Sequence, residues 1–343
     1  MIRAAVVGTG GIAGICHLPA LRSQAHRVRP VAAMDVDEAR VKAFCAEHSI
    51  EGAYTSLEEM LEAERPDLVH LCTPPHLHAA QAVACLEAGA WVWIEKPACL
   101  SLAEYDRIAA AEGPGRASVV SQHRFGSGAR HLRALAPELG RPLVALCVTT
   151  WYRDDAYYEV PWRGRWETEG GGPTMGHGIH QMDLMLSVLG DWTEIRAMTG
   201  TLERRIETED VSMATVRFDS GAMASIVNSV LSRREESYLR FDYTEATVEL
   251  RHLYGYRNAD WSSTSALWNP PEDLPSSHEA QLADLLDAYE RGEPPPMGGA
   301  DGRRALELAT GLYASAATGR PVLRADLVPG HPFYDRLDGR GWS

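Results

Sequence analysis

Two kinds of hydrophobic pattern follow each other along the chain. In the first 120 residues, short continuous apolar runs alternate with segments of helical periodicity. Strands that are apolar throughout and separated by helices are typical of a parallel sheet covered on both faces. We therefore expect a doubly wound domain. The apolar runs are 2–7, 28–34, 68–72, 91–94 and 118–120, and the helical segments are 12–23, 38–48, 56–63, 78–88 and 102–112.

The rest of the chain has a different texture. Long β-rich stretches cover 144–152 and 211–250, and Asp219-Ser220-Gly221 separates two strand patterns as a hairpin turn does. Two helical patterns follow at 279–291 and 301–318. We predict an α/β protein whose N-terminal Rossmann domain is followed by an α+β domain on a mostly antiparallel open sheet. The predicted boundaries are 1–122 for the first domain, 123–330 for the second and 331–343 for a tail.

Composition excludes several classes of protein. The 343 residues are 45% hydrophobic and 23% charged, which is ordinary for globular domains. A net charge of −14 argues against nucleic acid or an anionic membrane surface as partner. No apolar run approaches the roughly 18 residues of a membrane span, and no signal peptide pattern is present. The six cysteines form no CxxC pair, so we expect reduced, mostly buried thiols in a cytoplasmic protein.

A glycine-rich turn follows the first apolar run. Residues 8–13 read Gly-Thr-Gly-Gly-Ile-Ala, a GxGxxA pattern. Its first glycine permits a tight turn, its second lets the backbone approach a pyrophosphate, and its small last residue lets helix and strand pack closely. The phosphates would face the positive end of the next helix. The predicted cofactor contacts here are Gly8, Gly10, Gly11, Ile12 and Ala13.

An acidic residue answers this turn at the end of the second predicted strand. Asp35 lies 22 residues after Ala13. An acid at this position accepts hydrogen bonds from the ribose hydroxyls of NAD and repels the 2′-phosphate of NADP. We therefore predict NAD as the cofactor. Arg40, on the next predicted helix, leaves NADP open as an alternative.

The next apolar run ends in Cys-Thr-Pro-Pro-His-Leu-His. Parallel strands deliver their carboxyl ends to one edge of the sheet, where ligands bind. Thr73, Pro74 and His78 are therefore candidate cofactor contacts. For His78, a hydrogen bond at the start of the following helix is an equal alternative.

The run 91–94 ends at Glu95 and Lys96, which should reach the same edge and lie beside the cofactor, with Glu95 as a candidate cofactor contact. The chain has 33 basic residues, and only Lys42 and Lys96 among them are lysines. Arginine keeps its proton, whereas a partly buried lysine can lose it. A lysine at a strand end is thus a candidate for chemistry, with a surface ion pair as the alternative.

The glycine turn, the segment CTPPHLH (72–78) and the triplet EKP (95–97) together resemble the glucose–fructose oxidoreductase / inositol dehydrogenase (Gfo/Idh/MocA) family. In the second domain, WRGRWETEGGGPTMGHGIHQMDLMLSVLGD (162–191) resembles that family's Trp-Arg, GGG and G-x-H-x-x-D segment. The likeness covers nearly the whole chain. It implies an NAD(P)-dependent oxidoreductase of sugars, polyols or related carbonyl compounds.

The resemblance also implies residue roles. Lys96 would hydrogen-bond the reacting oxygen, and His180 would donate and accept the proton. Asp183 would orient the site from the next helical turn, while Trp162 and Arg163 would lie against the cofactor. Cations stabilise developing alkoxide charge, and histidine titrates near neutral pH, so these residue types suit hydride transfer from an alcohol.

One position departs from the family pattern. Many dehydrogenases of the family carry Asp four residues before the histidine, where this chain has Gly176 followed by His177. His177 and His180 share a helix face, so His177 is a candidate substitute. A metal cluster of these histidines with Asp183 is an alternative, but the i, i+3, i+6 spacing spreads the side chains around the helix. We expect no metal.

An aromatic run with arginines precedes this helix. It is compatible with stacking on a sugar and equally with a core or subunit contact. His123 and Arg124, which follow the last predicted strand of the first domain, are equally compatible with lining the cleft and with a core contact. The run comprises Trp151, Tyr152, Tyr157, Tyr158, Trp162 and Trp166, with Arg153, Arg163 and Arg165.

These observations lead to one main hypothesis and two alternatives. We expect a cytoplasmic NAD(P)-dependent oxidoreductase that transfers a hydride between nicotinamide and a secondary alcohol or ketone of a sugar, polyol or related small molecule. Its second-domain sheet suits a homodimer or homotetramer. The alternatives are a non-catalytic NAD(P)-binding sensor of the same fold and an NAD-dependent glycosidase. The specific substrate and the direction of the reaction do not follow from the sequence.

Overall fold

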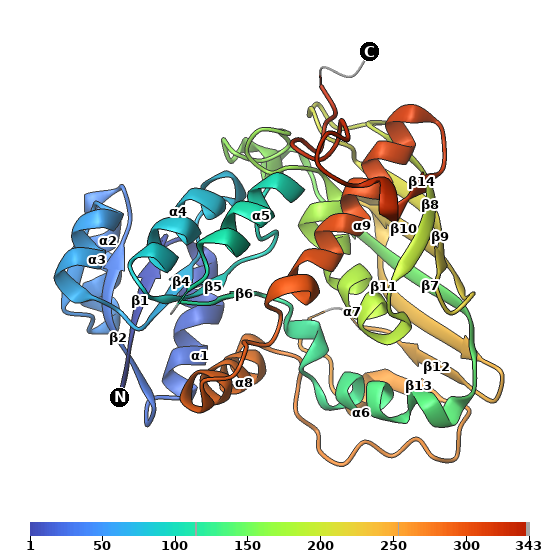
Figure 1. Cartoon of the computed structure of the whole chain (residues 1–343), viewed down its shortest axis with the longest axis horizontal. Helices are drawn as coiled ribbons and strands as arrows, with labels where there is room; N and C mark the ends of the chain where they lie inside the picture. The colour runs from blue at the N-terminus through green and yellow to red at the C-terminus, as the bar shows by residue number, and fades with distance from the viewer. Residues whose placement is uncertain (114, 253, 341–343) are drawn as a thin grey trace. The chain divides into compact units, whose positions relative to one another are not determined.

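The computed structural model describes residues 1–113, 115–252 and 254–340 (Figure 1). The last three residues of the predicted tail lie outside this description. The chain forms two compact units, and the first contains a late segment of the chain, His278–Arg303, which the sequence-based division places in the second domain. The first unit comprises Met1–Cys99, Glu104–Val120 and His278–Arg303, and the second comprises Leu100–Ala103, Ser121–Ser277 and Arg304–Ser343.

The first unit is built on the predicted parallel sheet. Its strand order is β3-β2-β1-β4-β5-β6, and every neighbouring pair is parallel. All residues of β4 and β5 are buried, so both faces of the sheet centre are covered. The short β3 was not predicted, because its three residues are partly buried or exposed and form no apolar run. The strands are β1 (Ile2–Val7), β2 (Val28–Met34), β3 (Gly52–Tyr54), β4 (Leu68–Leu71), β5 (Trp91–Ile94) and β6 (Ala117–Val119).

Three helices of this unit begin at recognisable local signals. Asp37 caps α2 by accepting from Arg40 N, and Ser56 caps α3 by accepting from Glu59 N. Pro75 occupies the first turn of α4, where a missing N–H costs nothing. The helices are η1 (Ala13–His17), α1 (Leu18–Ser23), α2 (Glu38–His48), α3 (Leu57–Glu64), α4 (Pro75–Glu87), α5 (Leu102–Ala111) and α8 (His278–Arg291).

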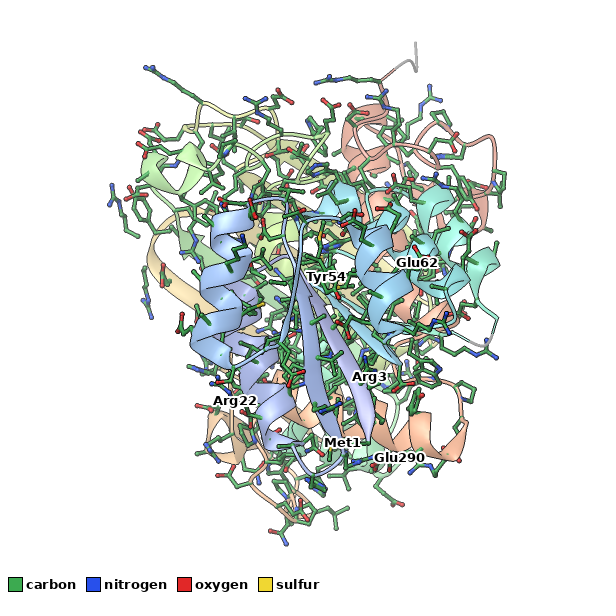
Figure 2. All side chains as sticks on the ribbon, turned by 90° about the vertical axis from the view of Figure 1, so that its left-hand side faces the viewer. Met1, Arg3, Arg22, Tyr54, Glu62 and Glu290 are labelled. Atoms are coloured by element: carbon green, nitrogen blue, oxygen red, sulfur yellow. The ribbon has the colours of Figure 1, made fainter. Side chains whose placement is uncertain are left out.

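Helix α8 completes the core of the first unit. Leu282, Leu285 and Leu286 are buried in one hydrophobic cluster with residues of β1, η1 and α1. Arg27 fastens the helix from outside through ion pairs with Asp287 at 2.7 Å and Glu290 at 2.8 Å. Figure 2 shows Glu290 near Met1, at the end of the sheet opposite the carboxyl end of β3. The helix is therefore held independently of its first residue, His278.

The second unit is built on an eight-stranded sheet in the order β13-β12-β11-β7-β10-β9-β8-β14. Only the pair β7 and β10 is parallel, which confirms the mostly antiparallel prediction. The predicted hairpin turn contains Gly221 at φ 83°, a value that favours glycine. The strands are β7 (Pro142–Tyr152), β8 (Trp192–Gly200), β9 (Val211–Phe218), β10 (Met223–Ser229), β11 (Leu231–Tyr243), β12 (Thr247–Leu250), β13 (Trp261–Ser263) and β14 (Val322–Leu323).

Helices cover one face of this sheet. Helix α7 is almost entirely buried and packs on β7 and β11, and the π-helical turn η5 precedes it directly. The helical segments here are η2 (Gln122–Arg124), α6 (Ser127–Leu135), η3 (Ala136–Leu139), η4 (Asp155–Glu159), η5 (Thr174–Gly178), α7 (Ile179–Leu189), η6 (Asn258–Asp260), α9 (Gly299–Thr318) and η7 (Arg324–Asp326).

Two compositional expectations are tested by the structure. None of the six cysteines, all of which lie in the described residues, forms a disulfide, and all but the partly buried Cys16 are buried, as expected. Across the part of the chain that the structure describes, no helix combines the length and the apolar composition that crossing a membrane requires.

Candidate functional site

The glycine turn after β1 has the geometry that a dinucleotide requires. Gly8 has φ 88°, and a Cβ there would lie 2.8 Å from the backbone of Cys72 and Thr73. Only glycine therefore fits at this close approach of two strand ends. A Cβ on Gly10 would meet nothing within 4 Å, so this part of the turn faces open space, whereas Ala13 is buried against the sheet. Exposed backbone N–H groups beside a helix start fit a pyrophosphate.

Asp35 is held beside this turn. Its Oδ2 accepts from Thr9 N at 2.9 Å and Thr9 Oγ1 at 3.0 Å, while its Oδ1 accepts from Asp37 N at 3.1 Å and Arg40 Nη1 at 3.3 Å. Burial acts to raise the pKa of Asp35, but these hydrogen bonds and the Arg40 charge hold it below its usual range. The side chain is therefore a fixed carboxylate, as recognition of ribose hydroxyls requires.

His78 joins the ends of two strands. Its ring is fully buried, with Nδ1 2.8 Å from Pro97 O and Nε2 2.8 Å from Thr73 O. Burial lowers the pKa of His78. The ring thus ties the loop after β4 to the loop after β5. Pro74 is the N-cap of α4, and Thr73 Oγ1 donates to Gln81 Oε1 at 2.6 Å.

Glu95 and Lys96 follow β5 at the same edge, and β5 neighbours β4, which neighbours β1. Glu95 Oε2 accepts from the backbone N–H of Lys96 at 3.1 Å. Glu95 Oε1 lies 3.1 Å from His17 Nε2 and 2.8 Å from His278 Nε2. Burial acts to raise the pKa of Glu95, but the two histidines hold it well below its usual range. Sequence reasoning placed Glu95 at this edge and missed both histidines.

In the second unit, His177 in η5 and His180 in α7 lie against aromatic rings. His180 stacks on His123 with ring centroids 4.8 Å apart, and it contacts the edge of Tyr254 at 5.3 Å. His177 contacts Trp151 at 5.3 Å, and Trp151 contacts Tyr254 at 5.2 Å. Both histidines therefore border the same aromatic pair. Tyr254 was not among the predicted residues, because it lies in an irregular segment after β12 without periodicity.

Asp183 faces an arginine. Its carboxylate accepts two hydrogen bonds from Arg124, with Nε at 2.8 Å and Nη2 at 2.6 Å, and both side chains are buried. Such a bidentate pair has fixed geometry. The expected orienting role of Asp183 would therefore act through Arg124, which ends η2 one residue after His123.

Trp162 and Arg163 belong to a second aromatic group. The Arg163 guanidinium carbon lies 4.0 Å from the centre of the Tyr157 ring and 4.3 Å from that of Trp162. Its Nη1 also pairs with the buried Glu169 at 3.0 Å. This arginine is held by stacking and charge together.

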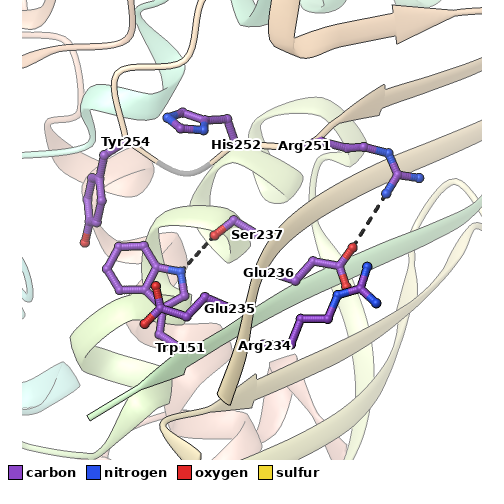
Figure 3. A pocket seen from close by; sticks show the side chains of 8 residues that line it. All are labelled: Trp151, Arg234, Glu235, Glu236, Ser237, Arg251, His252 and Tyr254. Atoms are coloured by element: carbon purple, nitrogen blue, oxygen red, sulfur yellow. Dashed lines mark hydrogen bonds and ion pairs between the residues drawn. The ribbon is translucent and has the colours of Figure 1, made fainter. Parts of the chain in front are cut away.

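A cavity of about 470 Å³ opens beside the aromatic pair (Figure 3). Trp151 Nε1 donates to Ser237 Oγ at 3.0 Å along its wall, and Arg251 lies 3.6 Å from Glu236. Indole, phenol and charged groups of both signs fit a polar, ring-shaped ligand. The lining residues are Trp151, Arg234, Glu235, Glu236, Ser237, Arg251, His252 and Tyr254.

These features define a class of protein: a nucleotide-dependent enzyme with a dinucleotide-binding Rossmann unit and a second unit whose open sheet carries a ring-lined polar cavity. Comparison with known families places it further. Residues 2–120 match the oxidoreductase family with an NAD-binding Rossmann fold, GFO_IDH_MocA, and residues 131–249 match the GFO/IDH/MocA C-terminal domain. The chain belongs to the Gfo/Idh/MocA family of oxidoreductases.

Two relatives and one solved structure that match over nearly their whole length illustrate this membership. 1,5-anhydro-D-fructose reductase from Ensifer adhaerens is 27% identical, covering 93% of this chain and 98% of that protein. Myo-inositol 2-dehydrogenase from Thermotoga maritima is 27% identical over 95% and 100%. The WlbA dehydrogenase from Bordetella pertussis, solved with NADH and UDP-GlcNAcA, is 27% identical over 94% and 98%, with a TM-score of 0.82.

Proposed function

We propose that this protein transfers a hydride between NAD and a secondary alcohol or ketone of a sugar, polyol or related small molecule. The observation that carries the proposal is the sheet order β1-β4-β5, because it brings the glycine turn and Lys96 to one edge of one sheet. Relatives that act on 1,5-anhydro-D-fructose and myo-inositol support this substrate class.

Residues of the first unit bind the cofactor and polarise the reacting oxygen. NAD, when bound, accepts or supplies the hydride. Backbone N–H groups of Gly10 and Gly11 cradle the pyrophosphate, and Asp35 accepts from the ribose hydroxyls. The Lys96 ammonium hydrogen-bonds the substrate oxygen and stabilises the negative charge that develops on it.

Residues of the second unit move the proton and bind the ring. His180 takes the proton from the substrate hydroxyl, or returns it in the reverse direction, because imidazole titrates near neutral pH. His177 takes the place of the family's aspartate, and Asp183 positions the site through Arg124. Trp162 and Arg163 contact the cofactor.

The aromatic pair supplies the substrate contact. Trp151 and Tyr254 stack on the apolar face of the sugar or polyol ring, because tryptophan and tyrosine combine a large apolar surface with a polar tip. The cavity beside them holds the remainder of the substrate through its charged and hydroxyl groups.

The test is replacement of Lys96 by methionine, which keeps most of the length and loses the charge. In Lys96→Met, kcat should fall by about 10²- to 10³-fold, since loss of one preorganised donor to an oxyanion costs about that much. The dissociation constant for NADH should change by less than about threefold, because the glycine turn and Asp35 are untouched. Stopped-flow absorbance of NADH and fluorescence titration measure the two quantities.

The second lysine is a matched control. Lys42 is exposed on α2 and pairs only with Glu38, four residues away, so Lys42→Met should retain wild-type kcat. Normal turnover by Lys96→Met would contradict the proposal. NADH binding without turnover by the wild-type protein, across a panel of sugars, polyols and aryl glycosides, would favour the non-catalytic alternative.

We also propose that the protein is a cytoplasmic homo-oligomer, joined through the open face of its second sheet. Large apolar side chains are exposed there on neighbouring strands, and Met198 and Met213 are paired in register, as are Met223 and Val144. Exposed apolar groups on adjacent strands are typical of interaction surfaces. Light scattering should give a mass of two or four chains, and a monomer at micromolar concentration would contradict this.

A further inference from the structure

We propose that His278, the first residue of α8, is a positioning residue for Lys96 and acts through the carboxylate of Glu95. This inference rests on the proposed function, because it assigns Lys96 to the reacting oxygen. His278 is 183 residues from Glu95 in the chain, yet its Nε2 lies 2.8 Å from Glu95 Oε1. Neither the EKP triplet nor any motif around residue 278 indicates this contact.

The contact is one link in a short buried chain of hydrogen bonds. His278 Nε2 donates to one oxygen of Glu95, and the other oxygen of Glu95 accepts the backbone N–H of Lys96 at 3.1 Å. His17 Nε2 also hydrogen-bonds Glu95 Oε1, the oxygen that His278 contacts, at 3.1 Å. A carboxylate held by donors on both oxygens has little rotational freedom. The backbone at Lys96 is therefore fixed by a side chain that α8 holds in place.

Protonation states follow from the same contacts. A carboxylate oxygen only accepts, so both Nε2 atoms carry protons. His17 Nδ1 lies 3.0 Å from His70 Nδ1, and one of these two atoms must donate. Burial lowers the pKa of His17 and places that of His70 well below its usual value. Both rings are then neutral, and His70 donates to His17.

The positive charge of the group lies on His278. Burial acts to lower its pKa, but contacts with Cys16 and Glu95 raise it to about 9. The groups that face His278 are Cys16 and His17 from η1, His70 from β4 and Glu95 after β5. Glu95 is the carboxylate among them, and its pKa is held well below the usual range, so His278 and Glu95 form a buried ion pair. Breaking such a pair leaves an uncompensated charge beside Lys96.

Anchoring of α8 does not depend on this pair. Arg27 binds Asp287 and Glu290 at the other end of the helix, and three leucines bury its middle. The effect of His278 on the site can therefore be separated from a general loosening of α8. Arg27→Gln removes two ion pairs from the same helix and leaves Glu95 untouched, which makes it the matched control.

The first experiment compares kinetics of three variants. His278→Leu removes charge and donor, and His278→Gln keeps a donor without charge. We expect kcat to fall about 10- to 100-fold in His278→Leu, as a small displacement of a catalytic group does, and less in His278→Gln. KM for NAD should stay within about threefold, because the substitution alters neither Asp35 nor the residues of the glycine turn. Arg27→Gln should keep kcat within about twofold.

The pH profile separates positioning from a structural role. Wild-type kcat should fall as the pH rises through about 9, where His278 loses its proton. This alkaline limb should be absent from His278→Leu, whose activity is low at every pH. A reduced kcat with the wild-type pH profile would overturn the proposal.

A second experiment does not depend on activity. The chain has two lysines, so protein labelled with ¹³C at lysine Cε gives two signals, and Lys96→Met assigns them. His278→Leu should shift the Lys96 signal and its titration midpoint and leave the Lys42 signal unchanged, while Arg27→Gln should shift neither. If the Lys96 signal responds but no substrate is turned over, the coupling stands and the proposed function fails.

Two further results would overturn the inference. One is a Lys96 signal and kcat in His278→Leu that equal those of the wild type. The other is stoichiometric zinc in the purified protein, measured by mass spectrometry and lost in His17→Gln. The side chains of His17, Glu95 and His278 would then be metal ligands, and His278 and Glu95 would not form an ion pair.

Discussion

Glu95 in the first unit and Glu209 in the second are both buried, but they differ in their hydrogen-bonding partners and in the direction of their pKa shifts. Glu95 in the first unit faces two histidines. Glu209 in the second accepts from Gly172 N at 2.9 Å, Thr174 N at 3.2 Å and Tyr313 Oη at 3.0 Å. The pKa of Glu95 is held well below the usual range, although burial acts to raise it, whereas burial raises the pKa of Glu209. The hydrogen-bonding partners of each carboxyl group therefore decide whether its pKa is raised or lowered.

The difference indicates two uses of a buried carboxyl group. Neutral donors around Glu209 fix the backbone at Gly172 and Thr174, where η5 begins, and η5 carries His177 and leads into α7 with His180. A charged partner at Glu95 makes its site sensitive to pH and to the loss of one proton. In the second unit, hydrogen bonds from neutral donors to Glu209 fix the backbone before His177. In the first unit, the ion pair of Glu95 with His278 fixes the backbone at Lys96.

The largest expected effect comes from neutralising the two glutamates in turn. Glu95→Gln should lower the free energy of unfolding by about 3–5 kcal/mol at pH 7, because it leaves the His278 charge buried without a partner. Glu209→Gln should cost only about 1–2 kcal/mol, since it perturbs hydrogen bonds between neutral donors and an acceptor. Denaturant unfolding followed by tryptophan fluorescence measures both. Equal losses would show that burial alone governs the two sites.

A smaller effect is expected from pH on the wild-type protein. The pKa of His278 is raised above its unfolded value of 6.5, so its stabilisation is complete below about 6.5 and is lost as the pH rises through about 9. The loss should be on the order of 3 kcal/mol. The pKa of Glu95 is depressed, so its stabilisation is present above about 4.5 and lost below. The ion pair of His278 and Glu95 therefore contributes most to the free energy of unfolding between about pH 4.5 and 6.5.

His278→Leu sharpens this prediction. Its free energy of unfolding should be lower than that of the wild type at pH 6.5 and nearly independent of pH between 6.5 and 9, because the titrating group is gone. Unfolding curves at half-unit pH intervals measure the slope. A variant slope as steep as that of the wild type would assign the alkaline instability to another group.

Local pattern determined much of this protein. Continuous apolar runs predicted β1, β2, β4, β5 and β6, because parallel strands covered on both faces carry mostly apolar side chains. The glycine turn was readable because the backbone approach at Gly8 excludes any Cβ, and Asp35 because the cofactor-binding turn and its acid follow a fixed spacing. The turn and its acid lie within about 30 residues of each other, whereas the Cβ clash at Gly8 is with Cys72 and Thr73, which β4 brings beside the turn.

Only the tertiary structure decided which side chains meet. The pairs His278 with Glu95, Arg124 with Asp183 and Tyr254 with His180 join residues far apart in the chain, and no periodicity marks them. Their contacts depend on how α8 returns to the first sheet and how α7 packs on the second. These arrangements are decided by the sum of many small packing energies over the whole fold. The hydrophobic pattern of a segment shows which of its faces is apolar, but it does not show which other segment that face packs against.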